Sequence, residues 1–129
     1  MPISRLFVLP MLVFAVSMAT AQAPAVVQVQ LASFSFTPKS IMLDHGQPYV
    51  LRLSNVSGSG HDFTAQEFFA AANVVPGDRK WIQEGVIEVP SGQVREIHLT
   101  APAAAATYKL KCSHSLHKVF GMSGTIVVR

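Results

Sequence analysis

The sequence of 129 residues contains a single cysteine, Cys112. One cysteine cannot form a disulfide within its own chain, and the Cys-x-x-Cys-His signature of covalent heme attachment is absent too. The sequence also lacks the Gly-Lys-Ser/Thr motif of a phosphate-binding loop, and it shows no Ser/His/Asp order or second carboxylate pair for hydrolysis. Hydrolytic catalysis, heme and a phosphate cradle are therefore not indicated. The lone thiol is expected to be buried, paired between chains or bound to a metal.

Charged residues are scarce as well, at 13% of the chain, and their formal net charge is +3. The lysines and arginines form no run and do not alternate with aromatic residues, as they would on a nucleic-acid-binding surface. Nucleic acid is therefore not expected as a partner.

The first residues have the pattern of a secretory signal peptide. Arg5 precedes an apolar run, and the small residues Ala-Thr-Ala at 19–21 match a cleavage site. The apolar run is short for a membrane span, and Pro10 interrupts it. We expect residues 1–21 to be removed, which leaves residues 22–129 as one periplasmic or secreted domain. This domain should be monomeric and should not insert stably into a membrane.

Alternating apolar residues predict short β-strands through most of the mature chain, for example at 27–31 and 49–53. After the first of these strands the apolar phase slips to Phe34 and Phe36, which predicts a bulge or bend. Residues 66–73 instead favour a short helix within a structured flap. The pattern as a whole predicts an all-β fold, an antiparallel Greek-key β-sandwich of seven to eight strands with a short helical flap.

One stretch near the C-terminus gathers soft metal ligands. Cys112, His117 and Met122 follow one another at intervals of five residues. Strand-like residues lie before and after this stretch, so a loop attached to the sheet at both ends can bring the three side chains together. Electron-transfer copper sites use two histidines, one cysteine and a weak axial methionine. The second histidine has to come from elsewhere, and His61, after a Ser/Gly-rich turn, is the candidate.

Other interpretations of these residues are possible. A lone buried cysteine is often an inert small hydrophobe, a methionine is often core filler, and single histidines such as His45 and His98 usually lie on the surface. Among the metals, structural zinc gains little from a thioether. A dinuclear copper centre would need a second cysteine. Copper at a mononuclear site therefore fits the donor types best.

The mature chain resembles the cupredoxins, the plastocyanin- and azurin-like blue copper proteins. The resemblance is carried by Phe34-x-Phe36-x-Pro38, by Asn55 through His61-Asp62-Phe63, and by Tyr108-x-Leu110-x-Cys112-x4-His117-x4-Met122 with 124–128 behind it. It implies a single type 1 copper ion as cofactor, bound by His61, Cys112, His117 and Met122. It also implies that redox partners dock on the apolar loop around His117.

The chain departs from the family pattern at two places. The ligand loop has Ser115-Leu116 instead of Pro-Gly before His117, and it carries an additional histidine, His114. Asp62 stands where many family members have asparagine, a residue that steadies the ligand loop in the family. The first departure leaves two loop imidazoles, His114 and His117, as possible ligands, of which the spacing favours His117.

Two functions are compatible with the predicted copper site. The first is that of a periplasmic one-electron carrier, not an enzyme, since no open coordination position and no second copper domain are indicated. The second is that of a copper carrier or storage protein that delivers the metal to another protein. The additional His114 and the Phe68-Phe69 pair of the flap favour the second function, whereas the mature chain has only Met42 and Met122 and so lacks the methionine-rich stretches of a dedicated Cu(I) chaperone.

Overall fold

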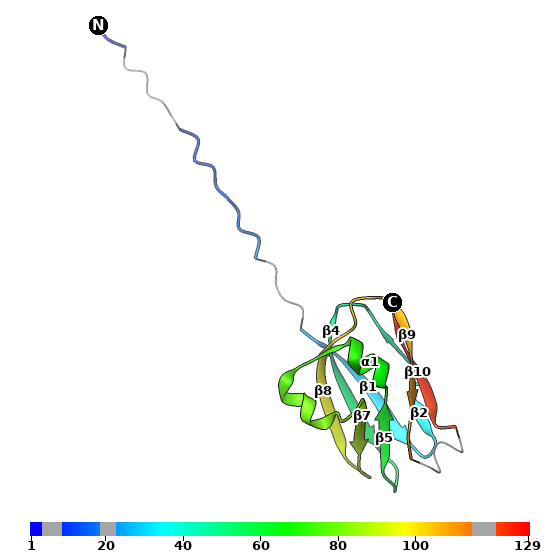
Figure 1. The fold of residues 1–129 in the computed structure, drawn as a ribbon. Helices are drawn as coiled ribbons and strands as arrows, with labels where there is room; N and C mark the ends of the chain where they lie inside the picture. The colour runs from blue at the N-terminus through cyan, green and yellow to red at the C-terminus, as the bar shows by residue number, and fades with distance from the viewer. Residues whose placement is uncertain (4–8, 19–22, 115–120) are drawn as a thin grey trace.

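The computed structural model describes residues 1–3, 9–18, 23–114 and 121–129 of the chain. Residues 9–18 lie within the predicted signal peptide and extend away from the folded domain (Figure 1). No helix in the described residues has the length and apolar character needed to cross a membrane. The cleavage after residue 21 remains a prediction.

Ten strands in the described residues form two five-stranded sheets that pack face to face (Figure 1). Sheet A has the order β2-β1-β4-β8-β6. Its strands are Ser35–Thr37, Ala25–Ala32, Pro48–Asn55, Val94–Thr100 and Asn73–Val74. Sheet B has the order β3-β10-β9-β5-β7. Its strands are Ser40–Leu43, Ser123–Val128, Ala106–Lys111, His61–Thr64 and Val86–Val89.

The predicted all-β sandwich is confirmed, and the structure adds detail to its topology. Two of the ten strands, β2 and β6, have only three and two residues, and such short segments leave little alternation in the sequence. Most neighbouring strands are antiparallel, but β1 pairs parallel with β4, and β3 pairs parallel with β10. The parallel pair in sheet A arises because the chain crosses to sheet B for β3 before it returns as β4.

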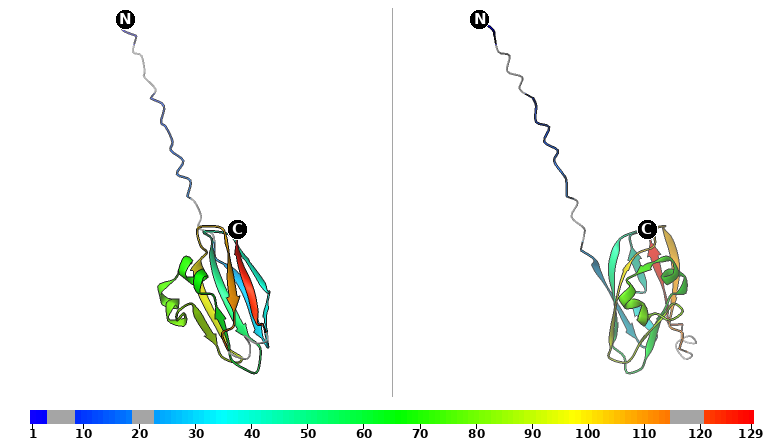
Figure 2. Two further views of the ribbon diagram at one scale, coloured as in Figure 1. Left: turned by 45° about the vertical axis from the view of Figure 1, so that its right-hand side comes forward. Right: turned by 60° about the vertical axis from the view of Figure 1, so that its left-hand side comes forward.

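The core lies between the two sheets and is extended by the flap. Phe63 is fully buried, and its ring centroid lies 6.0 Å from those of Phe36 and Phe69. The predicted helix is present as α1, Gln66–Ala71, and a short 3-10 helix, η1, follows at Pro76–Trp81. Phe68 of α1 is buried with its ring centroid 5.6 Å from that of Tyr108. The flap is therefore packed against one side of the sandwich and closes part of its core (Figure 2).

The bulge or bend expected after the first strand is a tight hairpin turn. β1 and β2 pair across it, so that Leu31 lies opposite Phe36, and both side chains are buried. Phe34 lies in the turn with a φ of 64° and is 42% exposed. The apolar phase slips because the chain reverses direction between the two buried residues, a reversal that alternation alone cannot distinguish from a bulge.

One glycine in β10 is required by a close approach of two backbones. A Cβ atom on Gly124 would lie 2.4 Å from the carbonyl oxygen of Lys39, which accepts the N–H of Thr125 at 2.9 Å. We expect Gly124→Ala to lower the free energy of unfolding by about 1–3 kcal/mol, because the contact is with backbone and cannot relax freely. Urea denaturation of the metal-free protein measures this, with Gly77→Ala as control, since a Cβ there meets no atom within 4 Å. Equal stability of the two variants would contradict the close approach.

Candidate metal centre

The first predicted ligand, His61, opens strand β5 on the inner face of sheet B. Strand residues alternate between faces, and Phe63, two positions on, lies in the core. His61 is itself fully buried, and its Nε2 atom is shielded from solvent. The imidazole is therefore held at the end of the sandwich core.

Cys112 follows directly after β9 and continues the inward face of that strand after Tyr108 and Leu110. Its side chain is fully buried. The Sγ atom accepts a hydrogen bond from the backbone N–H of Asp62 at 3.4 Å. The thiol thus lies beside the residue next to His61, as the prediction requires.

Met122 lies one residue before β10 and is also buried. Its carbonyl oxygen accepts the backbone N–H of Cys112 at 3.0 Å. Three of the four predicted ligands, His61, Cys112 and Met122, are therefore brought to one end of the sandwich from separate parts of the chain. The fourth, His117, lies outside the described residues, and its role as a ligand remains a prediction.

The environment of Cys112 favours the thiol form of the metal-free protein. Burial raises the pKa of this thiol, and the nearby carboxylates of Asp62 and Glu88 raise it further. Backbone N–H groups of Asp62 and His114 act in the opposite direction but do not reverse the shift. Since the thiolate is the form that binds a metal, a metal that enters this site has to displace the proton.

A pH dependence of metal binding follows from this shift. Because the folded pKa is raised, the thiol stays protonated through neutral pH, and each metal ion bound there releases one proton. We expect the apparent affinity for copper to rise about tenfold per pH unit between roughly pH 7 and 8. Competition titrations with a chelator of known pH dependence measure this slope. An affinity that does not change over this range would show that Cys112 does not bind the metal.

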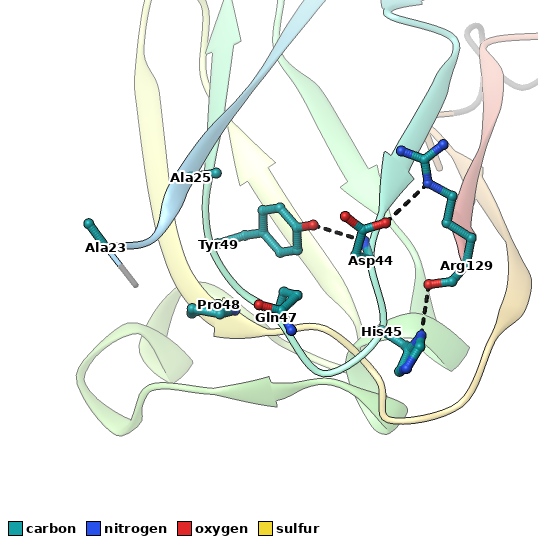
Figure 3. Close-up of a pocket in the computed structure, with 8 residues that line it drawn as sticks. All are labelled: Ala23, Ala25, Asp44, His45, Gln47, Pro48, Tyr49 and Arg129. Carbon is teal, nitrogen blue, oxygen red and sulfur yellow. Dashed lines mark hydrogen bonds and ion pairs between the residues drawn. The ribbon is translucent and has the colours of Figure 1, made fainter. Parts of the chain in front are cut away.

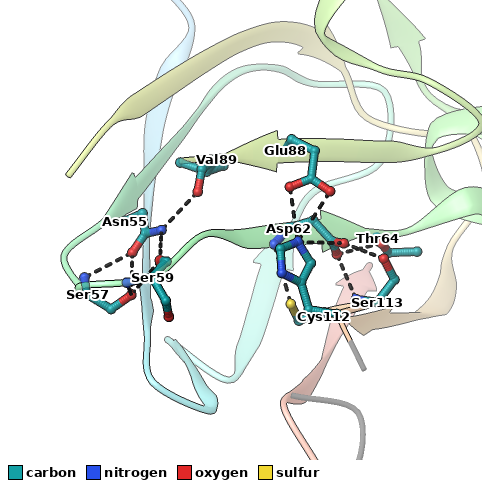
Figure 4. Close-up of polar contacts among 10 residues, drawn as sticks. Asn55, Ser57, Ser59, Asp62, Thr64, Glu88, Val89, Cys112 and Ser113 are labelled. Atoms are coloured by element: carbon teal, nitrogen blue, oxygen red, sulfur yellow. Dashed lines mark hydrogen bonds and ion pairs between the residues drawn. The ribbon is translucent and has the colours of Figure 1, made fainter. Parts of the chain in front are cut away.

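The carboxylate of Asp62 ties β5 to the residue after Cys112 (Figure 4). Its Oδ1 atom accepts the Ser113 N–H at 2.8 Å and the Thr64 hydroxyl at 2.8 Å. Its Oδ2 atom accepts the Ser113 hydroxyl. Asp62 is fully buried, so these hydrogen bonds compensate its loss of water. Ser113 was not among the residues predicted for the site, although its position next to Cys112 placed it within reach.

His114, the additional loop histidine, contacts two carboxylates. Its Nε2 atom lies 3.1 and 3.3 Å from the carboxylate oxygens of Glu88 and 3.7 Å from Oδ2 of Asp62. Asp62, Cys112 and His114 each place one donor atom within 4.8 Å of the others. Cys112 is therefore bordered by a second group of polar side chains, which includes Glu88, a residue that was not predicted to belong to the site.

The loop before His61 is organised by Asn55. The side-chain amide donates to the carbonyl oxygens of Ser59 and Val89, each at 2.8 Å, and its Oδ1 atom accepts the Ser57 N–H at 2.9 Å. Asn55-Val56-Ser57 matches a glycosylation sequon. Asn55 is 2% exposed, so its side-chain amide is committed to the loop in the folded protein. Asparagine side chains often hydrogen-bond to the backbone two residues on, a turn signal that could have indicated this role.

A wide groove lies at the opposite end of β10 from Met122, with a volume of about 560 Å³ (Figure 3). Its polar groups are bonded to one another. His45 Nδ1 lies 2.9 Å from the Arg129 carbonyl oxygen, Arg129 Nε lies 3.1 Å from Asp44, and the Asp44 N–H donates to Tyr49. His45 and His98 are exposed, as expected, and His98 pairs with Asp78 of η1. This groove is structural and contributes nothing to the metal centre.

Comparison with known proteins agrees with this geometry. The sequence profile of the copper-binding proteins of the plastocyanin/azurin family matches residues 23–129. The chain is similar in fold to a dithionite-reduced auracyanin from Roseiflexus castenholzii, with a TM-score of 0.60 at 17% identity over 84% of this chain and 99% of that one. It is similar also to auracyanin B, with a TM-score of 0.59 at 19% identity over 88% and 95% of the two chains. No match was found among curated protein sequences.

Proposed function

Because the chain belongs to the plastocyanin/azurin family of copper-binding proteins and is a blue copper protein with one type 1 copper ion, we propose that it acts as a periplasmic one-electron carrier between redox partners. It would be an electron carrier and not an enzyme. The observation that supports this proposal is that three buried side chains with soft or borderline donor atoms, those of His61, Cys112 and Met122, lie at one end of the sandwich.

These residues suit the cofactor by their chemistry. A thiolate and two imidazoles with a weak thioether are the donor set of electron-transfer copper, which cycles between Cu(II) and Cu(I). His61 and Cys112 would hold the ion, with Met122 as a weaker ligand. All three side chains are enclosed by the core and attached to strands, so they can keep one geometry for both oxidation states. Because the geometry of the site would change little, only a small rearrangement would accompany electron transfer.

We propose that the partners are proteins that dock on the apolar loop around His117. Electrons would leave through the imidazole edge of this residue. The domain would act as a monomer, without nucleic acid and without stable membrane insertion. The weak net charge of the mature chain, nine Lys and Arg against seven Asp and Glu, gives little electrostatic steering, so apolar contact would dominate docking.

Copper delivery is a second candidate, and one observation favours it. His114 has a side chain that is 35% exposed and a ring nitrogen near Cys112, which could receive or pass on a metal ion. A carrier of this kind would release copper readily to a partner. An electron carrier would retain the ion through many redox cycles.

Metal analysis and visible spectroscopy of the purified domain test the proposal. We expect one copper per chain and an intense visible band of the Cu(II) form from thiolate charge transfer. Repeated reduction and reoxidation should leave the copper content unchanged. A colourless Cu(II) complex, or preference for zinc in competition, would rule out the type 1 site. Ready loss of copper to a chelator with a normal band would instead support the delivery function.

A further inference from the structure

We propose that Glu88 is a positioning residue for the copper site. Through His114 and Asp62, it fastens the start of the ligand loop to sheet B. This inference rests on the proposed function, because it concerns how the same site is held. It is carried by the arrangement of Asp62, Glu88 and His114 beside Cys112.

Side chains alternate between the two faces of sheet B, and this alternation separates the core residues of β5 and β7 from the acidic residues. In β5, His61 and Phe63 face the core, so Asp62 and Thr64 face the other side. In β7, Ile87 and Val89 are buried, and Glu88 between them has a side chain that is 62% exposed. Asp62 and Glu88 are also direct cross-strand partners in the register of β5 and β7. Two carboxylates therefore stand side by side on the outer face, directly behind His61.

Like charges directly opposite each other destabilise a sheet unless something lies between them. The imidazole of His114 does so, with Nε2 within 3.1 Å of Glu88 and 3.7 Å of Asp62. Both facing groups are acceptors, so this nitrogen carries a hydrogen and donates it. The two carboxylates thus hold the His114 ring in a bridging position through its Nε2 atom.

The bridge acts on the thiol through neighbouring residues. His114 and Ser113 directly follow Cys112, and Asp62 binds both the N–H and the hydroxyl of Ser113. The backbone N–H of Asp62 in turn donates to Cys112 Sγ. Glu88 therefore supports, from the exposed edge strand, the contacts that orient the thiolate. Partners of this kind affect metal affinity without touching the metal.

Three variants of the full domain distinguish the role of Glu88 as a hydrogen-bond acceptor from the effect of its charge. Glu88→Ala removes the acceptor, and Glu88→Gln keeps an acceptor without the charge. Glu96→Ala is the matched control, because Glu96 also makes an exposed ion pair, with Arg52, on the outer face of sheet A. The rate of copper loss to a chelator is measured for each variant. For the metal-free forms, thermal unfolding and the imidazole nitrogen resonances of His114 are measured.

We expect Glu88→Ala to lose copper roughly three- to tenfold faster than the wild type, below the effect of a partner bonded directly to a ligand. Glu88→Gln and Glu96→Ala should stay near the wild-type rate. In a His114→Ala background, Glu88→Ala should have no further effect, since its action passes through that ring. The metal-free Glu88→Ala protein should show shifted His114 resonances but the same unfolding midpoint as Glu96→Ala.

Unchanged copper loss and unchanged His114 resonances in Glu88→Ala would overturn the inference. So would an effect of Glu88→Ala that persists at full size without His114. Failure of the proposed function looks different: the wild-type protein would then lack the charge-transfer band, while the resonances of the metal-free protein would still report whether the bridge exists.

Discussion

Replacement of Cys112 by serine is expected to abolish the visible charge-transfer band of the copper-bound protein and to leave the β-sandwich folded. The band requires a thiolate bound to copper, and a hydroxyl cannot replace it in a soft donor set. The fold should survive because the sandwich is held by the apolar inner faces of sheets A and B. A buried hydroxyl at this position costs about 1–3 kcal/mol, which a domain of this size can tolerate.

Visible absorption and copper content report on the site, and far-UV circular dichroism and urea denaturation report on the fold. His45→Ala serves as the control, because it removes an exposed imidazole at the opposite end of the sandwich and should keep the full band. If Cys112→Ser unfolds the metal-free protein, Cys112 is mainly a packing residue. Retention of an intense band in this variant would show that the thiolate is not the ligand.

The second large effect is expected at the loop histidines. His117→Gly should remove one copper ligand and with it the normal band, and added imidazole should enter the open position and restore the band. His114→Ala should keep the band and shift the reduction potential only modestly, because the family resemblance assigns the loop ligand to His117 and the Nε2 atom of His114 contacts Glu88 and Asp62. Absorption spectra with and without imidazole measure both outcomes. His98→Ala, which removes an exposed imidazole paired with Asp78, is the control.

The opposite outcome for the two loop histidines would also be visible in the absorption spectra. Loss of the band in His114→Ala, with retention in His117→Gly, would place the ligand at His114. It would contradict the assignment of His117 as the loop ligand. A band that imidazole cannot restore in His117→Gly would indicate that the loop collapses when the side chain is removed.

The amino-acid sequence by itself determined the fold class and the types of ligand. Alternation of apolar residues is a local property, so strands such as β1, β4 and β9 could be predicted without knowledge of their partners. The inward direction of Cys112 followed from the same alternation, because it continues the phase of Leu110. The spacing of the donors near the C-terminus, together with the family resemblance, then indicated copper.

Only the tertiary structure decided which strands are neighbours and therefore what lies behind the site. The pairing of Asp62 with Glu88 depends on the register of β5 and β7, which are separated in the chain by the whole flap. The position of His114 could not be predicted either, because the chain leaves β9 after Lys111 and the alternation ends there. Register and loop direction are set by contacts between distant segments, so local patterns carry no information on them.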